Sequence, residues 1–214
     1  MDAQFWIDKW KEGQIGFHKN EFNEALVKYF PYVSPQKNEK VLVPLCGKSK
    51  DLLWLKNQEL NVHGVELYEK AAEAFFLENN LSFDKSERGD FIDYSSPGIT
   101  ISCGDFFNLG KVDKYHHIYD RAALVALPFD MRRRYAKVIN DVLQKGGKYL
   151  LIVYEYNQDE MSGPPFSVSK SEIEELYGDH FSIKLLESER PQTEGPKLLE
   201  LSNFKQNIYL LEKN

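Results

Sequence analysis

The chain has 214 residues, of which 42% are hydrophobic and 28% charged, and its formal net charge at pH 7 is −6. The length favours one domain over residues 1–214, and the acidic balance argues against a general nucleic-acid binder, because phosphate contact needs a basic surface. No stretch approaches about 18 consecutive apolar residues, which argues against a membrane span. We expect no secretory leader, because residues 1–10 are polar and aromatic; the two cysteines, with no CxxC motif, favour a cytoplasmic protein with buried thiols. We also expect a monomer.

The N-terminal residues are dense in aromatic side chains. Residues 5–10 contain two of the three tryptophans, Trp6 and Trp10, and Phe17 follows after two glycines. Such a segment is either a lid packed on the core or a flap over a cofactor, where aromatic faces would meet a sulfonium cation or an adenine. Residues 22–30 then have the spacing of a helix, which Pro31 ends.

Residues 41–66 form the unit around which the chain is organised. A short apolar run ends in a turn at Gly47, helix-compatible spacing follows over residues 52–55, and a second apolar run ends at Glu66. This order predicts a strand, a helix and a parallel strand, so that Gly47 and Glu66 lie at the same edge of a sheet. An acidic residue about 20 positions after the glycine turn is where nucleotide-binding sheets place an acceptor for ribose hydroxyls.

The glycine content of this turn narrows the choice of cofactor. A dinucleotide fingerprint needs several glycines, and a Walker loop needs a second glycine ahead of Gly47-Lys48-Ser49; neither is present. A nicotinamide-dependent oxidoreductase is disfavoured for this reason. A cofactor with a ribose and no phosphate fits better, and S-adenosylmethionine is the common one. The alternative is an ordinary strand–helix–strand unit in which Glu66 is a surface residue.

The following segments place another carboxylate at a strand end. Residues 69–79 have the pattern of a helix, and the alternating runs 91–94 and 99–103 flank a turn signal, which predicts a β-hairpin. After the second run comes Gly104, followed by Asp105. The Asp105 carboxylate either accepts a hydrogen bond from an adenine amine or caps its own turn.

A further buried strand leads to an arginine. Arg121 follows Asp120 at the end of an apolar run. Because a buried arginine is rare unless it is paired, Arg121 either forms a structural pair with Asp120 or faces the cofactor carboxylate or an anionic acceptor. His116 and His117 have no third ligand at metal spacing, so we interpret them as structural and expect no metal site.

Another helix and strand follow this loop. Residues 130–143 are predicted to form a helix, and the following Gly146-Gly147 prevents its continuation. The three arginines 132–134 on this helix are interpreted as a solvated face. A strand over 149–156 then leads into the loop 161–166. Two prolines stiffen this loop, which suits a wall of an acceptor pocket.

The C-terminal residues complete the sheet. Ser169 is predicted to N-cap a helix that extends to Leu176, with Glu172 in the capping-box position. Residues 181–186 and 208–211 are predicted to be a closing pair of strands.

Together these motifs resemble the thiopurine S-methyltransferase family, and the resemblance covers nearly the whole chain. The matching stretches are Trp6…Trp10 with Ile15-Gly16-Phe17-His18, Pro44-Leu45-Cys46-Gly47-Lys48-Ser49 with Asp51, Gly64-Val65-Glu66-Leu67, Cys103-Gly104-Asp105-Phe106-Phe107, Tyr119-Asp120-Arg121-Ala122-Ala123-Leu124-Val125-Ala126-Leu127-Pro128 and Gly163-Pro164-Pro165-Phe166. The short N-terminus and the Cys-Gly-Asp-Phe-Phe form resemble the bacterial branch. The resemblance implies a class I S-adenosylmethionine-dependent methyltransferase with an α/β, Rossmann-like fold. Its sheet would be seven-stranded and mostly parallel, with the last strand antiparallel and helices on both faces.

The resemblance also implies roles for individual residues. It assigns cofactor binding to Trp6, Trp10, Leu45, Glu66, Gly104, Asp105 and Arg121, and acceptor binding to Phe17, Pro164 and Phe166. Residues 1–35 would be a flap and a helix over the active site. Arg121 would be catalytic, because it favours the thiolate or holds the acceptor in line with an already electrophilic methyl group. A second family arginine near the acceptor falls within 189–200, where Arg190 and Lys197 are candidates.

The expected function is transfer of the methyl group of S-adenosyl-L-methionine to the sulfur of thiopurines or other aromatic or heterocyclic thiols, in detoxification, with S-adenosyl-L-homocysteine as product. One alternative is a methyltransferase that acts on halide, sulfide, or selenium or tellurium compounds. Another is a non-catalytic protein that binds S-adenosylmethionine. The expected partner is a small-molecule thiol acceptor, with neither nucleic acid nor membrane.

Overall fold

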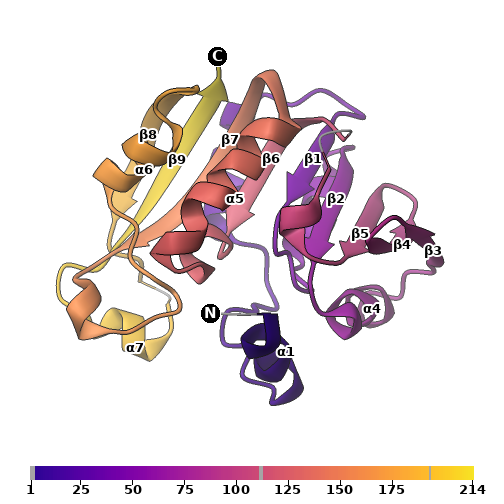
Figure 1. Ribbon diagram of the computed structural model, residues 1–214, viewed down its shortest axis with the longest axis horizontal. Helices are drawn as coiled ribbons and strands as arrows, with labels where there is room; N and C mark the ends of the chain where they lie inside the picture. The colour runs from indigo at the N-terminus through magenta and orange to yellow at the C-terminus, as the bar shows by residue number, and fades with distance from the viewer. Residues whose placement is uncertain (1–2, 111–112, 193) are drawn as a thin grey trace.

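The structure is a computed structural model that describes residues 3–110, 113–192 and 194–214. Its centre is a nine-stranded sheet in the order β3-β4-β5-β2-β1-β6-β7-β9-β8 (Figure 1). The strands are β1 (Lys40–Val43), β2 (Asn61–Glu66), β3 (Asp84–Arg88), β4 (Phe91–Ser96), β5 (Ile99–Cys103), β6 (Tyr115–Arg121), β7 (Leu143–Glu155), β8 (Phe181–Glu189) and β9 (Lys205–Lys213). Strands β5, β2, β1, β6 and β7 run parallel, and β9 is antiparallel to β7 and β8.

The sheet has the predicted parallel centre and antiparallel last strand, but the predicted count of seven strands is wrong. β4 and β5 form the predicted hairpin, and β3 and β4 extend the edge of the sheet beyond β5. β3 carries no sequence signal because all five of its residues are exposed and none is apolar. The apolar–polar alternation that marks a half-buried strand is therefore missing there.

Helices cover both faces of the sheet, as predicted. α2 (Glu24–Tyr29), α3 (Asp51–Asn57) and α4 (Glu69–Glu78) pack in one core with alternate residues of β1, and α5 (Phe129–Val142) and α6 (Lys170–Tyr177) pack in the core on the other face. Two further helices, α1 (Ala3–Lys11) and α7 (Pro196–Leu199), lie beyond one edge of the sheet (Figure 1). Short 3-10 turns are η1 (Phe30–Val33), η2 (Phe106–Asn108), η3 (Leu124–Ala126) and η4 (Gln158–Glu160).

The ends of two helices differ from the sequence prediction. α2 begins after Asn23, whose side chain accepts a hydrogen bond from the backbone N–H of Leu26 at 3.1 Å and so caps the helix. α5 ends before the predicted glycine stop, because β7 already begins at Leu143 and includes Gly146 and Gly147. This first part of β7 lies beside a shift in its register with β6, so the glycines belong to an irregular strand.

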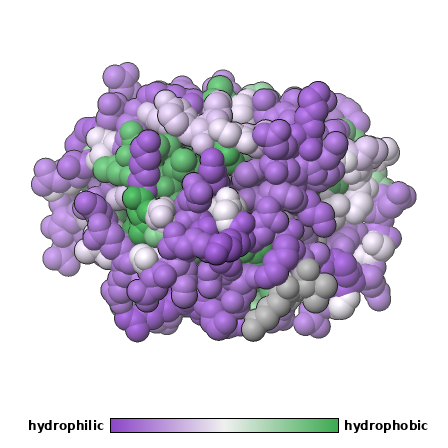
Figure 2. Space-filling model, turned by 90° about the horizontal axis from the view of Figure 1, so that it is seen from above, coloured by the Kyte–Doolittle hydropathy of each residue, from purple (hydrophilic) through white to green (hydrophobic). Residues whose placement is uncertain are grey.

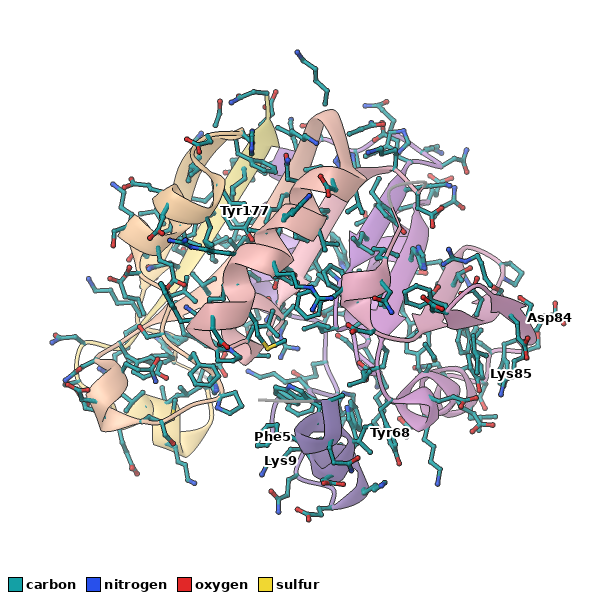
Figure 3. All side chains as sticks on the ribbon, in the orientation of Figure 1. Phe5, Lys9, Tyr68, Asp84, Lys85 and Tyr177 are labelled. Atoms are coloured by element: carbon teal, nitrogen blue, oxygen red, sulfur yellow. The ribbon has the colours of Figure 1, made fainter. Side chains whose placement is uncertain are left out.

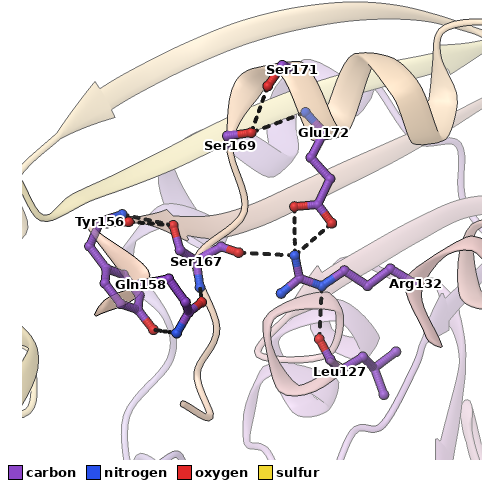
Figure 4. A network of polar contacts seen from close by, with 8 residues as sticks. All are labelled: Leu127, Arg132, Tyr156, Gln158, Ser167, Ser169, Ser171 and Glu172. Atoms are coloured by element: carbon purple, nitrogen blue, oxygen red, sulfur yellow. Dashed lines mark hydrogen bonds and ion pairs between the residues drawn. The ribbon is translucent and has the colours of Figure 1, made fainter. Parts of the chain in front are cut away.

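The interpretation of 132–134 as a solvated helix face is wrong for Arg132. This side chain is buried, with the residue 2% exposed, and lies between α5, α6 and the loop before α6 (Figure 4). Its Nη1 donates to both carboxylate oxygens of Glu172 at 2.7 Å and to the Ser167 carbonyl at 3.0 Å, and its Nε donates to the Leu127 carbonyl at 2.9 Å. Tertiary partners therefore satisfy a charge that the local sequence pattern places in solvent.

The N-cap of α6 is confirmed, but its Glu172 side chain has a different role. The Ser169 hydroxyl accepts a hydrogen bond from the backbone N–H of Glu172 at 3.2 Å (Figure 4). A capping box would direct the Glu172 carboxylate back to the backbone N–H of Ser169. Instead this carboxylate binds Arg132 on α5 and so ties the two helices together.

No helix among the residues that the structure describes combines the length and apolar character needed to cross a bilayer. The surface on the side of the molecule opposite α1 and α7 is largely hydrophilic, with one apolar area at the left of the view (Figure 2). Cys46 and Cys103 are free and buried, as expected.

The arginine run provides a matched test of burial. Glu172→Ala leaves the buried Arg132 charge without its carboxylate, and we expect it to lower the free energy of unfolding by about 3–5 kcal/mol. Glu175→Ala removes the carboxylate that pairs with the exposed Arg133 on the same two helices, and its cost should be about 0.2–1 kcal/mol. Urea denaturation of both variants measures the difference. Equal losses would contradict the structural role of Arg132.

Candidate functional site

Several of the predicted site residues meet at one edge of the sheet. Leu45, Glu66, Gly104 and Arg121 lie at or just after the ends of β1, β2, β5 and β6. Because these strands are parallel neighbours, their carboxyl ends share one edge, and open α/β sheets bind ligands at that edge. α1 lies beyond the same edge (Figure 1).

The Glu66 carboxylate joins two parts of this edge. It is 6% exposed, and its oxygens accept hydrogen bonds at 2.8 Å from the backbone N–H groups of Gly47 and Tyr68. Burial raises the pKa of the Glu66 carboxyl above its ordinary value, and the backbone N–H donors oppose that rise. The side chain thus fixes the turn after β1 relative to the end of β2.

The turn after β1 has a backbone shape that leaves room for an aromatic ring. Leu45 and Gly47 both have left-handed φ angles, of 46° and 54°. A Cβ atom on Gly47 would lie 3.0 Å from the Trp10 ring, so glycine is needed for both its φ angle and this close approach. A non-glycine residue such as Leu45 in this region stores strain, a feature that clusters at ligand sites.

The N-terminal segment contacts the turn through its aromatic residues. Trp10 stacks on Tyr68 with ring centroids 6.2 Å apart, and Tyr68 lies beside α1 (Figure 3). Phe17 packs edge-on against both Trp6 and Trp10, at 5.8 and 5.5 Å. Because α1 contains no buried residue, it does not contribute to the core of the protein. Its aromatic residues instead pack against one another and against the edge that Gly47 and Glu66 define.

Asp120 and Arg121 point to different partners. The fully buried Asp120 carboxylate accepts hydrogen bonds from the Tyr135 and Tyr149 hydroxyls at 2.6 and 2.8 Å, and from the backbone N–H groups of residues 123 and 124 at 3.3 and 3.2 Å. Arg121 is partly buried and donates through Nη2 to the Phe17 carbonyl at 3.2 Å. The alternative of a structural Asp120–Arg121 pair is therefore not what the structure shows.

The loop predicted as an acceptor-pocket wall is fixed at several points. The backbone N–H of Phe166 donates to the carbonyl of Val125, four residues after Arg121, at 2.6 Å. The Tyr156 hydroxyl donates to the Pro165 carbonyl at 2.6 Å. Gly163 has a φ angle of 72°, and a Cβ atom there would lie 2.5 Å from the Phe166 ring. Pro164 and Phe166 are both partly exposed. The loop 161–166 is thus tied to the loop that follows β6.

In the Gly104–Asp105 turn, the Asp105 side chain caps its own turn. The Asp105 side chain is exposed and accepts a hydrogen bond from the backbone N–H of Phe107 at 2.9 Å. The Gly104 N–H donates to the Glu66 carbonyl at 2.9 Å, and a Cβ atom on Gly104 would lie 2.6 Å from the Phe91 ring. The turn therefore needs a glycine and lies directly beside Glu66.

Other reactive side chains form no second centre among the residues that the structure describes. No group of three or more possible metal ligands is present among those residues, and His117 binds Glu39 through Nε2 at 2.8 Å. Burial raises the pKa of the Cys46 thiol, and burial raises the pKa of the Cys103 thiol to about 12. Neither thiol is activated as a nucleophile.

A groove of about 230 Å³ lies at the amino ends of the parallel strands, opposite the edge that carries Glu66. The polar groups that line it bind one another. His63 binds the Tyr115 hydroxyl at 2.5 Å and the Ser102 hydroxyl at 2.6 Å, and Arg88 donates to Asp93 at 2.7 Å. Burial, with the charge of Arg88, lowers the pKa of His63 to about 4. The groove is lined by charged and polar groups that bind one another, and it lies away from the edge that carries the predicted site.

Comparison with known proteins decides the family. The thiopurine S-methyltransferase family model matches residues 1–214. The chain belongs to the thiopurine S-methyltransferase family. A protein named thiopurine S-methyltransferase from Nitrosospira multiformis is 41% identical over 215 residues, covering 99% of this chain and 98% of the relative. Another of the same name from Vibrio campbellii is 42% identical over 214 residues, covering 99% and 98%. The family prediction is thus confirmed.

Solved structures show the same fold at low sequence identity. A Burkholderia thailandensis 1,6-didemethyltoxoflavin-N1-methyltransferase, crystallised with S-adenosylhomocysteine, has a TM-score of 0.69 at 15% identity and covers 99% of this chain and 87% of its own. TehB from Haemophilus influenzae has a TM-score of 0.64 at 18% identity and covers 99% of this chain and 67% of its own. These likenesses support the predicted Rossmann-like methyltransferase fold.

In the stretch 189–200, the two candidates for a second arginine and one acid have different partners. Arg190 donates to the Leu199 carbonyl, and Lys197 is exposed in α7. Glu194 accepts hydrogen bonds from the Tyr154 hydroxyl at 3.0 Å and from Lys19 at 3.1 Å. No motif or periodicity points to Glu194, because it lies in an irregular segment and its partners are distant in sequence.

A conservative substitution tests the role of Glu66 in cofactor binding. Glu66→Gln replaces one acceptor oxygen by an NH₂ donor that would face a backbone N–H, and it removes the charge available to ribose hydroxyls. We expect the affinity for S-adenosylhomocysteine to fall by roughly 1.5–3 kcal/mol, with the sheet intact. Calorimetric titration measures this loss, and Glu69→Gln, whose carboxylate binds Lys85 and Tyr94 nearby, is the control. Unchanged affinity would remove Glu66 from the cofactor site.

Proposed function

We propose that this protein transfers a methyl group from S-adenosylmethionine to the sulfur of thiopurines or other aromatic or heterocyclic thiols. The observation that carries the proposal is the position of the buried Glu66 carboxylate beside the Gly47 turn, with Trp10 packed over that turn. Membership of the thiopurine S-methyltransferase family supports both the reaction and the cofactor.

The residues at this edge fit the cofactor. The Glu66 oxygens accept backbone N–H groups, including those of Gly47 and Tyr68, and a carboxylate with about four lone-pair positions can also accept ribose hydroxyls. The absence of a side chain on Gly47 lets a bound group approach the backbone, and Trp10 and Tyr68 offer aromatic faces to a sulfonium cation or a base. In this proposal Leu45, Trp6 and the Gly104-Asp105 turn complete the cofactor site.

The acceptor side needs orientation more than proton abstraction. S-adenosylmethionine supplies an electrophilic methyl group, and aromatic thiols lose their proton easily. In the proposal the Arg121 guanidinium favours the thiolate and holds it in line, while the rings of Phe17 and Phe166, with Pro164, form the walls. Residues 1–35, of which 1 and 2 lie outside the described residues, act as a flap and helix over the site in this proposal. Phe17 binds Arg121 through its carbonyl, and its ring contacts Trp6 and Trp10.

The acceptor class is tested by incubation with labelled S-adenosylmethionine and separate panels of aromatic thiols, halides, sulfide, and selenium and tellurium compounds. We expect methylated thioethers from the aromatic and heterocyclic thiols. Methyl transfer confined to halide or selenium compounds would overturn the acceptor assignment. Tight cofactor binding without transfer to any acceptor would instead support a non-catalytic binding protein.

Arg121→Lys separates catalysis from structure. Lysine keeps the charge but loses the planar fork, so we expect a melting temperature close to that of the wild type and a rate with aromatic thiols about 10- to 100-fold lower. The loss should be smaller for acceptors already ionised at the assay pH. Arg133→Lys, at an exposed site on α5, is the control. A large fall in melting temperature with normal activity of the folded fraction would leave Arg121 a structural residue.

A further inference from the structure

Glu194 connects two segments that border the acceptor side of the site. One of its carboxylate oxygens accepts a hydrogen bond from Tyr154, near the end of β7, at 3.0 Å. The other oxygen binds Lys19 at 3.1 Å. Lys19 lies two residues after Phe17, and the Phe17 carbonyl accepts a hydrogen bond from Arg121. Glu194 therefore lies where the N-terminal segment, the carboxyl end of β7 and the loop before α7 come together.

The Glu194 carboxylate keeps unused acceptor capacity. Its side chain is only 9% exposed, so solvent can satisfy little of it. A carboxylate offers about four lone-pair positions, and among the residues that the structure describes, the bonds from Tyr154 and Lys19 use two of them. A largely buried acceptor with free lone pairs favours a ligand that brings a hydrogen-bond donor.

The charges around Tyr154 give this preference a direction. Burial and the Glu194 charge raise the pKa of Tyr154, and Arg121 opposes the rise. The Tyr154 hydroxyl thus stays a donor to Glu194. Arg121 pairs with Ile152 of β7, two residues before Tyr154, so a thiolate at Arg121 would lie near the same end of β7 as Tyr154 and Glu194.

We propose that Glu194 is a specificity-determining residue of the acceptor site: it accepts a hydrogen bond from the ring N–H of a heteroaromatic thiol and disfavours aryl thiols that carry a second negative charge. This inference rests on the proposed thiol methyltransferase function. It differs from the expectation of a second arginine in 189–200, which would favour anionic acceptors. The acceptor class is therefore a heteroaromatic thiol with a donor near its sulfur.

The test compares two acceptors in the full-length protein. One is 2-mercaptobenzimidazole, which has a ring N–H, and the other is 4-mercaptobenzoate, which has a carboxylate. The measured quantity is the kcat/KM for 2-mercaptobenzimidazole divided by the kcat/KM for 4-mercaptobenzoate. The melting temperature is measured alongside it. For Glu194→Gln we expect this ratio to fall about tenfold or more, mainly through KM, because a charged acceptor is lost and a donor is added. Glu200→Gln, exposed and close in sequence, should leave the ratio unchanged.

A second variant must move the ratio the other way. Lys19→Gln removes the cation that neutralises Glu194, so rejection of 4-mercaptobenzoate should strengthen and the ratio should rise. Opposite shifts cannot come from a general loss of structure. An unchanged ratio in either variant, at a normal melting temperature, overturns the role of Glu194, and if Glu194→Gln does not fold, Lys19→Gln alone decides. If the wild type methylates no thiol at all, the proposed function fails instead.

Discussion

The hydrogen bonds between the Glu66 carboxylate and the backbone N–H groups of Gly47 and Tyr68 set the geometry of the site. They hold the turn after β1 against the end of β2, where Cys46 N–H also donates to the Val65 carbonyl at 3.0 Å. Burying a carboxylate is costly, and bonds from fixed backbone donors offset that cost. Without them the turn would lose the position that admits the Trp10 ring.

Asp120 performs a comparable structural task at the end of β6. Its carboxylate binds two tyrosine hydroxyls and the backbone N–H groups just after Ala122, which has a left-handed φ of 62°. Because these four donors occupy the Asp120 carboxylate, its charge is compensated within the core and the loop. Arg121, the next residue, therefore does not pair with Asp120 and instead contacts the N-terminal segment. Two buried acids thus shape the edge, and Arg121 contributes a positive charge to it.

The features that could be predicted from sequence are those set by local pattern. Gly47 and Glu66 belong to one strand–helix–strand unit, so parallel pairing of β1 with β2 brings them together. Arg132 could not be placed, because its carboxylate partner is 40 residues away on another helix. Glu194 depends on a lysine 175 residues away, and nothing in its own segment indicates that contact. Long-range pairing of charges is decided by packing, which periodicity does not encode.

The N-terminal segment links the two sides of the site. α1 has nine residues and none is buried, and an isolated helix shorter than about 12–15 residues is marginal in water. Its order therefore depends on its contacts: Trp10 with Gly47 and Tyr68 on the proposed cofactor side, and the following residues with Arg121 and Glu194 on the proposed acceptor side. A group bound on either side would meet the same short segment. Low local stability is what allows such a segment to respond, since its contacts can change without disturbing the sheet.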